Sequence, residues 1–279
     1  YDLLWLDHKI VGNPKKMEEF ISTDLSEVFL IIDPEKIENS AQSDFMKSMI
    51  HNPFKAKGII IVQSKKLTWA ISRKQKTHPI IYINKTKIQF KNKKITIDIQ
   101  AKLKENLITQ NVIGYVKGSL YPDSFLVLSA HYDHLGMLGP NAIFYGANDN
   151  ASGTAMILNF AKHYSKPKNK PKYSIMFIAF GAEEIGLIGS KHYSNNPYFP
   201  LEKMKFLINV DIMGTGDDGI TIVNGKSNPN EFNLFNKINE ENNYLKKIKL
   251  RGKAANSDHH WFDQKGVKSI FIYTMGGSK

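Results

Sequence analysis

The sequence predicts an α/β fold, in which a mainly parallel, twisted sheet is flanked by helices and a small β-rich lobe comes first. Two observations predict this class. From about residue 106 onward, short runs rich in β-branched and aromatic residues alternate with helical stretches, which is typical of a parallel sheet covered by helices. The preceding segment lacks this alternation, and short strand-like runs dominate it. We therefore expect two domains, residues 1–105 and residues 106–279.

The small lobe is expected to consist mainly of strands. Its apolar, β-branched runs predict strands at residues 28–32, 58–62, 80–83, 87–90 and 95–99. Helical periodicity is confined mainly to residues 43–50. The change in pattern places the domain boundary between residues 100 and 111.

The larger domain carries the alternation on which the fold class rests. Strands are predicted at residues 125–130, 174–180, 205–210 and 268–273. Helices are predicted between them, at residues 151–164, 185–194 and 230–244. This order predicts a doubly wound sheet with helices on its faces.

Composition excludes several kinds of site. The 279 residues include no cysteine, so disulfides and thiolate metal sites are excluded, and any metal ion must be bound by His, Asp or Glu. The formal net charge is +12, but only Arg73 and Arg251 are arginines. Because specific phosphate contacts favour arginine, we expect no nucleic-acid partner. No apolar run approaches the roughly 20 residues that span a bilayer, so we expect no membrane span.

Ionisable residues gather where the predicted strands end. Six of them follow a strand or lie in the small-residue loop before the first helix: His131, Asp133, Asp149, Glu183, Glu184 and Asp211. In an open α/β sheet, ligands bind outside the carboxyl ends of the strands, because the loops converge there. We therefore expect these side chains to lie along one edge of the sheet.

So many carboxylates in one cleft would repel each other unless cations compensate them, and two zinc ions would do so. Each residue alone has another interpretation. His131 could be a buried hydrogen-bonding histidine, Asp149 a helix N-cap, and Asp211 a turn residue. Glu183 and Glu184 could be acids favoured in the first turn of a helix. It is their joint occurrence at one sheet edge that favours a metal site.

Five strings carry a resemblance to a known family: SAHYDH at 129–134, GANDNASG at 146–153, FGAEEIG at 180–186, NVDIMG at 209–214 and SDH at 257–259. In order and spacing they resemble the co-catalytic zinc aminopeptidases, which include the bacterial leucyl type and are related to glutaminyl cyclases. The resemblance spans roughly residues 111–273. It implies the zinc exopeptidase fold, two zinc ions in the complete enzyme, and hydrolysis of peptide substrates from their N-terminus.

The resemblance also implies a role for each residue. His131 and Asp211 would bind one zinc ion, Asp149 would bridge both ions, and Glu184 would bind the other. Glu183 would be the general base, which takes a proton from the metal-bound water. From the residues themselves, the carboxylate of Asp133 can accept the proton of the other His131 ring nitrogen.

Asp258 lies near the active site in the family. Its alternative interpretation is the N-cap of a short helix over residues 257–262.

The sequence departs from the family at its C-terminal end. The family places a last zinc-binding histidine after the strand at residues 268–273, but the sequence ends at Lys279. We expect the chain to be truncated there, with a second metal position bound by Asp149 and Glu184 alone and weakly occupied. We do not expect four other histidines to replace the missing ligand: His134, His192, His259 and His260.

The small lobe resembles a protease-associated insert, on the strings KGIIIV at 57–62 and HPIIY at 78–82, and this implies an influence on substrate access. Two alternative functions remain open. One is glutaminyl cyclase-like acyl transfer, and the other is a catalytically inactive, receptor-like binding domain. Family habit implies a secreted or periplasmic protein. The sequence predicts neither the preferred substrate side chain nor the oligomeric state.

Overall fold

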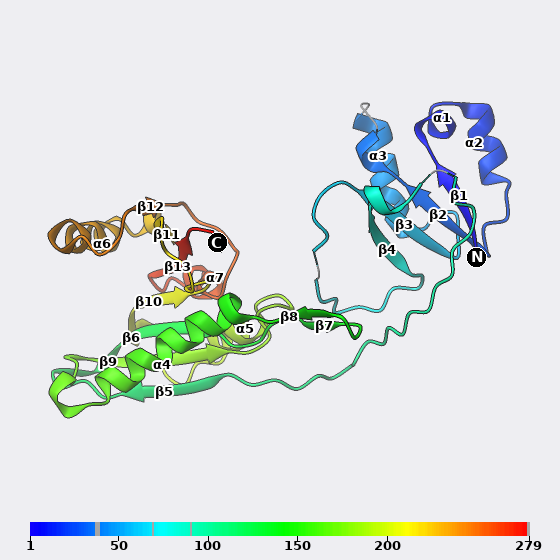
Figure 1. Ribbon diagram of the computed structural model, residues 1–279. Coiled ribbons are helices and arrows are strands. Elements are labelled where there is room, and N and C mark those ends of the chain that lie inside the picture. Colours follow the sequence, from blue (N-terminus) through cyan, green and yellow to red (C-terminus); the bar gives the residue numbers. More distant parts are fainter. Residues whose placement is uncertain (37–39, 69, 90, 278–279) are drawn as a thin grey trace. The chain divides into compact units, whose positions relative to one another are not determined.

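The computed structural model describes residues 1–36, 40–68, 70–89 and 91–277. The chain forms two compact units, Tyr1–Glu105 and Asn106–Lys279 (Figure 1). Each unit has its own sheet and its own hydrophobic core. Among the helices of the described residues, none combines the length and the apolar character that crossing a membrane requires.

The small unit is built on a four-stranded parallel sheet in the order β1-β2-β3-β4. Its strands are β1 Asp2–Leu6, β2 Val28–Ile32, β3 Gly58–Gln63 and β4 Ile80–Asn84. Its helices are α1 His8–Val11, α2 Pro14–Ile21 and α3 Ser40–Ser48. Apolar clusters lie on both faces of the sheet, which explains why β2 and β3 are continuous apolar runs.

Two strands predicted for the small unit are wrong. Residues 85–87 form a 3-10 turn, residues 88 and 89 lie outside any strand, and residue 90 lies outside the described residues. Residues 95–99 form no strand, because pairing with β1 stops at Ile95, which exchanges two backbone hydrogen bonds with Tyr1. Beyond it, Ile97 packs against the sheet by its side chain. Apolar and polar residues alternate there with the period of a strand, which is why the sequence predicted one.

Strand β1 and helices α1 and α2 were not predicted. Both helices carry capping signals: Asp7 accepts hydrogen bonds from the backbone N–H groups of Lys9 and Ile10, and Asn13 caps α2. Pro14 follows Asn13 at the first helical position, as is common. The unit is therefore more helical than its strand-like runs suggested.

The large unit confirms the predicted class, a mainly parallel sheet flanked by helices. Its seven strands run in the order β12-β11-β13-β10-β6-β9-β5. Their bounds are β5 Val112–Val116, β6 Tyr121–His131, β9 Tyr173–Phe180, β10 Met204–Val210, β11 Gly219–Val223, β12 Ile248–Leu250 and β13 Ser269–Met275. The central strands β13, β10, β6 and β9 are parallel, whereas β5 and β11 run antiparallel to β9 and β13. A separate hairpin consists of β7 Gly136–Leu138 and β8 Ala142–Phe144.

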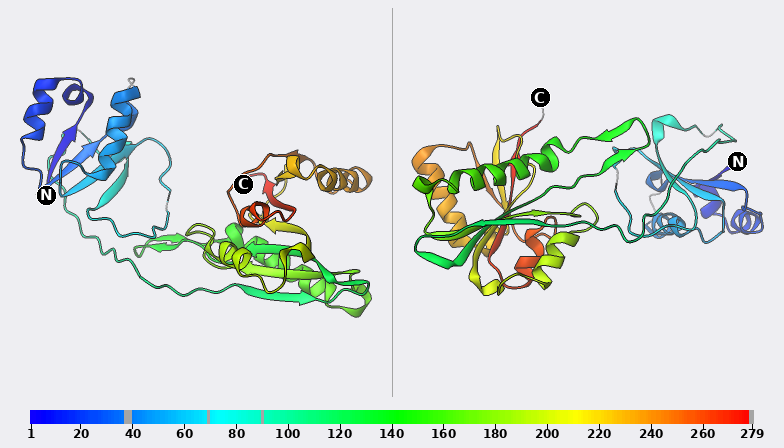
Figure 2. Two further views of the ribbon diagram at one scale, coloured as in Figure 1. Left: turned by 180° about the vertical axis from the view of Figure 1, so that it is seen from behind. Right: turned by 90° about the horizontal axis from the view of Figure 1, so that it is seen from below.

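Helices cover both faces of this sheet (Figure 2). They are α4 Gly153–Tyr164, α5 Ile188–Asn195, α6 Pro229–Asn242 and α7 His259–Gln264. Along β9, Ile175 and Phe177 pack on the side of α4, whereas Met176 and Ile178 pack on the side of α5 and α7. Successive strand residues point to opposite faces, so the continuous apolar run of β9 supplies both cores.

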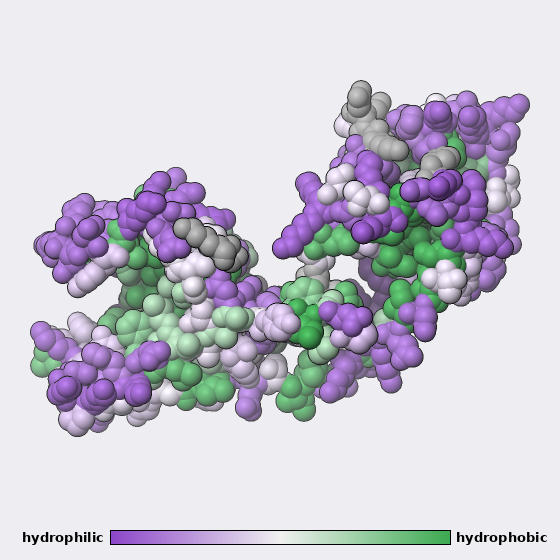
Figure 3. Space-filling model, in the orientation of Figure 1, coloured by the Kyte–Doolittle hydropathy of each residue, from purple (hydrophilic) through white to green (hydrophobic). Residues whose placement is uncertain are grey.

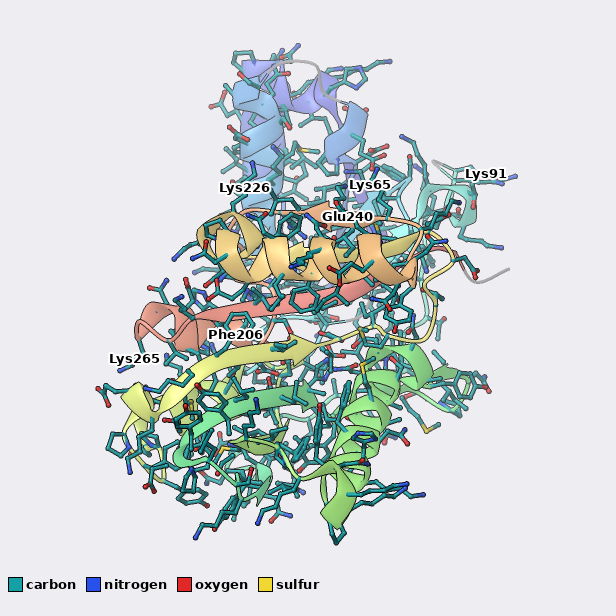
Figure 4. The ribbon with its side chains drawn as sticks, turned by 90° about the vertical axis from the view of Figure 1, so that its left-hand side faces the viewer. Lys65, Lys91, Phe206, Lys226, Glu240 and Lys265 are labelled. Carbon is teal, nitrogen blue, oxygen red and sulfur yellow. The ribbon has the colours of Figure 1, made fainter. Side chains whose placement is uncertain are left out.

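Helix α6 packs over the end of the sheet that holds β11 and β13. Phe232 lies against Ile220 and Ile270, and Phe206 of β10, labelled in Figure 4, packs at the edge of the same cluster. Hydrophilic side chains cover most of the visible outer surface of α6 (Figure 3).

Candidate metal centre

Three predicted site segments meet at one edge of the large sheet. His131 is the last residue of β6, Asp211 follows β10 directly, and Glu183 lies three residues beyond the end of β9. Because β10, β6 and β9 are adjacent and parallel, their carboxyl ends lie side by side. The fold thus brings these residues together as the edge rule predicts.

The first group of possible metal ligands consists of His131, Asp149 and Asp211. The Nε2 atom of His131 lies 3.2 Å from Asp149 Oδ1 and 3.3 Å from Asp211 Oδ1. His131 is 1 % exposed and Asp211 is 6 % exposed. Burial alone would lower the pKa of His131, but the surrounding aspartates raise it, so this pocket strongly favours a cation.

The ring of His131 is oriented by a backbone carbonyl. Its Nδ1–H donates to the carbonyl oxygen of Asp133 at 3.1 Å, which leaves Nε2 with a lone pair directed to the first group. We predicted that the Asp133 carboxylate would accept this proton, and the structure corrects that detail. The carboxylate is 3.7 Å from Nδ1.

The carboxylate of Asp133 instead holds the neighbouring loop. Its two oxygens accept hydrogen bonds from the backbone N–H groups of Glu183 at 3.1 Å and Glu184 at 3.2 Å. Burial would raise the pKa of Asp133, but His131 and these two donors lower it, so the group stays ionised. These two hydrogen bonds therefore connect the Glu183–Glu184 segment to the loop that follows β6.

The loop that carries Asp149 is held by the polar residues around it. Asn150 is buried; its amide donates to the Val210 carbonyl at 3.1 Å, and its Oδ1 accepts from the Gly153 N–H at 3.0 Å. A Cβ at Gly153 would lie 2.3 Å from that Oδ1 atom, so glycine is required there. The alternative interpretation of Asp149 as the N-cap of α4 is wrong, because Ser152 occupies that position.

Asp211 is oriented by a buried chain of hydrogen bonds. The Ser129 hydroxyl donates to Asn209 Oδ1 at 2.8 Å, the Asn209 amide donates to Ser257 Oγ at 2.7 Å, and the Ser257 hydroxyl donates to Asp211 Oδ2 at 3.1 Å. We did not predict Ser129 or Asn209 as site residues. The available signal was a polar residue at a buried position within an apolar strand.

Glu183 belongs to neither possible ligand group in the part of the chain that the structure describes. Burial raises its pKa to about 8; His131 opposes the rise, and Asp258 and Asp211 add to it. Without a metal ion, this carboxyl group is therefore mostly protonated at neutral pH. A buried carboxyl group with a pKa near neutrality is suited to take up and return a proton.

The second group consists of His134, Asp149 and Glu184. His134 Nδ1 lies 2.7 Å from Glu184 Oε1, and burial followed by the Asp149 charge raises the pKa of Glu184. We expected His134 to have no suitable place for such a group, and the structure instead sets its ring against Glu184. That His134 does not replace the missing ligand stays a prediction. Its loop turns after His131, so the two rings, three residues apart, face different carboxylates.

Asp258 takes the N-cap position of α7, as the alternative interpretation predicted, but its side chain makes no capping hydrogen bond. It is fully buried, and the Ser190 side chain lies beside it as a hydrogen-bonding group. Burial raises its pKa to about 7. The next residue, His259, is also fully buried, and burial lowers its pKa to about 4.

The predicted residues open into a cavity of about 310 Å³. It is lined by His131, Asp149, Glu183, Glu184, Asp211, Ile212, Arg251, Asn256, Phe271 and Tyr273. Arg251 and Tyr273 were not predicted to lie here; the Arg251 Nη1 atom is 3.5 Å from the Tyr273 hydroxyl. Three larger hollows, of about 760, 490 and 480 Å³, have a single carboxylate, Asp123, among their lining residues. The smaller cavity, which four carboxylates line, is therefore the candidate for cation binding.

The family model described as "Peptidase family M28" matches residues 111–279. The chain belongs to peptidase family M28. This confirms the resemblance drawn from the five strings. A curated relative, the aminopeptidase YwaD of Bacillus subtilis, is 34 % identical over 168 residues, which cover 57 % of this chain and 35 % of the relative. The chain thus spans about a third of that protein.

Two solved structures have a similar fold. The zinc aminopeptidase BSAP from Bacillus subtilis superimposes with a TM-score of 0.64 at 24 % identity, over 98 % of this chain and 64 % of that one. A glutaminyl cyclase from an Acidobacteriales bacterium gives a TM-score of 0.51 at 22 % identity, over 61 % of this chain and 59 % of the other. Both kinds of enzyme therefore share the architecture of the large unit.

The residues present fit divalent cations. Each group combines one imidazole with carboxylates, a set that zinc accepts. Three of their buried atoms contact only other ligand atoms, in poor hydrogen-bond geometry, within the described residues: His134 Nδ1 and Glu184 Oε1 face each other, and Asp211 Oδ1 faces His131 Nε2. Leaving buried polar atoms unpaired costs free energy, and a bound cation would satisfy them.

Proposed function

We propose that this protein is a zinc-dependent aminopeptidase that removes N-terminal residues from peptides. One observation carries the proposal: two ligand groups share Asp149, while Glu183, beside the ligand Glu184, belongs to neither group. Membership of family M28 and the likeness to an enzyme named an aminopeptidase support it. The activity of the whole protein, its peptide substrates and its zinc ions are part of the proposal.

In this proposal His131 and Asp211 would hold one zinc ion, Glu184 would hold the other, and Asp149 would belong to both sites. When bound, zinc supplies Lewis acidity for the scissile carbonyl and lowers the pKa of a water molecule. His131 is suited to its role because the Asp133 carbonyl holds Nδ1 and Nε2 faces the carboxylates of Asp149 and Asp211.

Glu183 is the residue that transfers the proton. Its carboxylate takes the proton of the attacking water and returns it to the amine that leaves, which is the usual work of a general base that becomes a general acid. The Asp133 carboxylate fixes the backbone of Glu183 and Glu184, so the base and the ligand keep their separation.

The remaining residues prepare the site. The chain of hydrogen bonds through Asn209 and Ser257 orients Asp211, and Asn150 holds the loop of Asp149 against β10. Arg251 brings a positive charge to a cavity that four carboxylates also line, and guanidinium groups pair well with carboxylates.

Export from the cytoplasm stays a prediction from the family resemblance.

A panel of substrates tests this function. We expect hydrolysis of aminoacyl anilides and of peptides with a free N-terminus, and no hydrolysis of N-acetylated peptides. Cyclisation of N-terminal glutaminyl peptides without anilide hydrolysis would favour the acyl-transfer alternative. Zinc binding without turnover of any substrate in the panel would favour the inactive, receptor-like alternative.

A further inference from the structure

Arg251 stands out among the basic residues of the chain. The sequence has 38 lysines and arginines, and only two of them are arginines. Arg251 follows β12 directly and lines the cavity of the candidate metal centre. Its backbone N–H donates to the Ile222 carbonyl at 3.0 Å, and its carbonyl oxygen accepts from the Lys226 N–H at 3.3 Å. The guanidinium group is therefore carried by a strand end whose backbone is held on both sides.

The charge of Arg251 has no acidic partner in the part of the chain that the structure describes. Its Nη1 atom approaches the Tyr273 hydroxyl at 3.5 Å, and no carboxylate forms an ion pair with it. Lys246 and Lys253, which flank it in the sequence, do form ion pairs with aspartates. A guanidinium group has five N–H donors in a planar fork, so most of those of the exposed Arg251 are available to a bound molecule.

The acids of the cavity already have other partners or roles. Asp149, Glu184 and Asp211 belong to the ligand groups, and Glu183 is the proposed base. A cation bound by the ligand groups would offset the negative charge of these carboxylates, so Arg251 would then be a positive charge that nothing in the lining offsets. The other lining side chains, apart from His131, are uncharged: Ile212, Asn256, Phe271 and Tyr273.

Two aromatic rings provide the surface beside the guanidinium group. Phe271 and Tyr273 are two residues apart on β13, so their side chains lie on the same face of the strand. Their ring centroids are 5.4 Å apart. Apolar ring surface excludes water and lowers the local dielectric, which strengthens a charged hydrogen bond formed next to it. Arg251 is therefore placed to bind an anionic group of a molecule in the cavity.

We propose that Arg251 binds a carboxylate of the peptide substrate, so that the enzyme prefers substrates that bring a negative charge into the cavity. A carboxylate suits a guanidinium group because two parallel N–H···O bonds can form. The carboxylate is supplied either by an acidic N-terminal residue or by the free C-terminus of a dipeptide. This inference rests on the proposed function and adds the substrate class. Arg251 determines specificity in this role and does not transfer the proton.

Two pairs of substrates that differ by one charge test the proposal and separate the two sources. The first pair is an aspartyl and an asparaginyl anilide, and the second is leucylglycine and its C-terminal amide. We expect kcat/KM to favour the charged member by about 10- to 100-fold in at least one pair, because hydrogen bonds to charged groups are among the stronger ones. The pair that shows the preference identifies the carboxylate that Arg251 binds.

Variants of Arg251 assign the preference to this side chain. Arg251→Gln is expected to bring the ratio within that pair close to 1, and Arg251→Lys, which keeps the charge without the fork, to give an intermediate ratio. Arg73→Gln, at the other arginine, exposed and in the small unit, is the matched control and should keep the wild-type ratios. Ratios close to 1 in both pairs of the wild type, or a preference that Arg251→Gln retains, would overturn the proposal.

Calorimetry distinguishes this failure from failure of the proposed function. If none of the four compounds is hydrolysed, the aminopeptidase proposal fails, and their Kd values in zinc-supplied protein still test Arg251. Tighter binding of a charged member that Arg251→Gln abolishes would support the role of Arg251 as the carboxylate-binding residue. Equal Kd values within both pairs would contradict it.

Discussion

Glu183 and Glu184 are neighbours in the sequence but lie in different surroundings. Glu184 faces His134 and Asp149, whereas Glu183 belongs to neither ligand group. Burial, with the nearby charges of Asp258 and Asp211, raises the pKa of Glu183 to about 8. Environment thus gives two identical side chains different chemistry, which is how enzymes separate a ligand from a base.

Asp258 gives a pH dependence with a definite sign. Its pKa of about 7 in the folded protein lies above the 3.8 of a solvent-exposed aspartate, so the stability linked to this group is present below about pH 4 and is lost as the pH rises to 7. Asp258→Asn replaces the ionisable group by a neutral amide, so this loss of stability with rising pH does not occur. We expect the metal-free variant to be more stable than wild type at pH 8, by about 4 kcal/mol relative to their difference at pH 4.

Urea unfolding in a chelator, followed between pH 4 and pH 8, measures this difference. Asp217→Asn, at an exposed aspartate, is the control and should change the profile little. Equal pH profiles for wild type and Asp258→Asn would show that burial of this carboxyl group is not linked to folding.

At the scale of elements, the loop from residue 147 to residue 152 contributes to the candidate metal centre as the strand ends do, because it carries Asp149. We predicted a helix from residue 151, but α4 begins at Gly153, because the preceding residues form their own turn. Asn150 connects this turn to β10. The sequence shows a small-residue loop there, but the partner of Asn150 is 60 residues away and only the fold identifies it.

Removing the Asn150 amide tests this connection. Asn150→Ala loses bonds to Val210, Gly153 and Ile212 and leaves buried backbone groups unpaired, so we expect a loss of roughly 2–4 kcal/mol of folding free energy. Zinc affinity should fall as well, because Asp149 loses its support. Asn159→Ala, at an exposed position of α4, is the control for both measurements. If Asn150→Ala were less stable but bound zinc with unchanged affinity, the claim that Asn150 supports Asp149 in metal binding would be wrong.

Four strands of the large unit, β6, β9, β10 and β13, were predictable because their apolar runs are bounded by turns, whereas β5, β7, β8, β11 and β12 were not predicted. The predicted segment at 174–180 and the observed β9 differ by one residue at one end. The clustering of the acids was predictable as well, since all but Asp149 come soon after one of these four strands. The contact of His134 with Glu184 was not predictable, because it depends on how the loop after β6 turns, which periodicity does not encode.

At the scale of the molecule, every residue of the candidate metal centre comes from the unit Asn106–Lys279. That unit has its own sheet and its own core on both sheet faces. The likeness of the small unit to a protease-associated insert stays a prediction, as does any influence on substrate access.

The independence of the large unit can be measured directly. We expect a chain of residues 106–279 to fold cooperatively and to bind zinc with the affinity of the whole chain, because the ligand groups and their supporting hydrogen bonds all lie within it. Circular dichroism melting and zinc titration of both chains provide the comparison. A much weaker zinc affinity in the shorter chain would mean that the small unit helps to form the site.

The central claim is that Glu183 transfers a proton beside metal ions that it does not bind. The kinetics of Glu183→Gln, combined with analysis of its metal content, test this claim most directly. We predict wild-type zinc content and a kcat lower by about 10²- to 10⁴-fold, whereas Glu184→Gln should lose zinc. Glu202→Gln, at an exposed glutamate, should behave like wild type. A fully loaded Glu183→Gln with undiminished kcat would contradict the account.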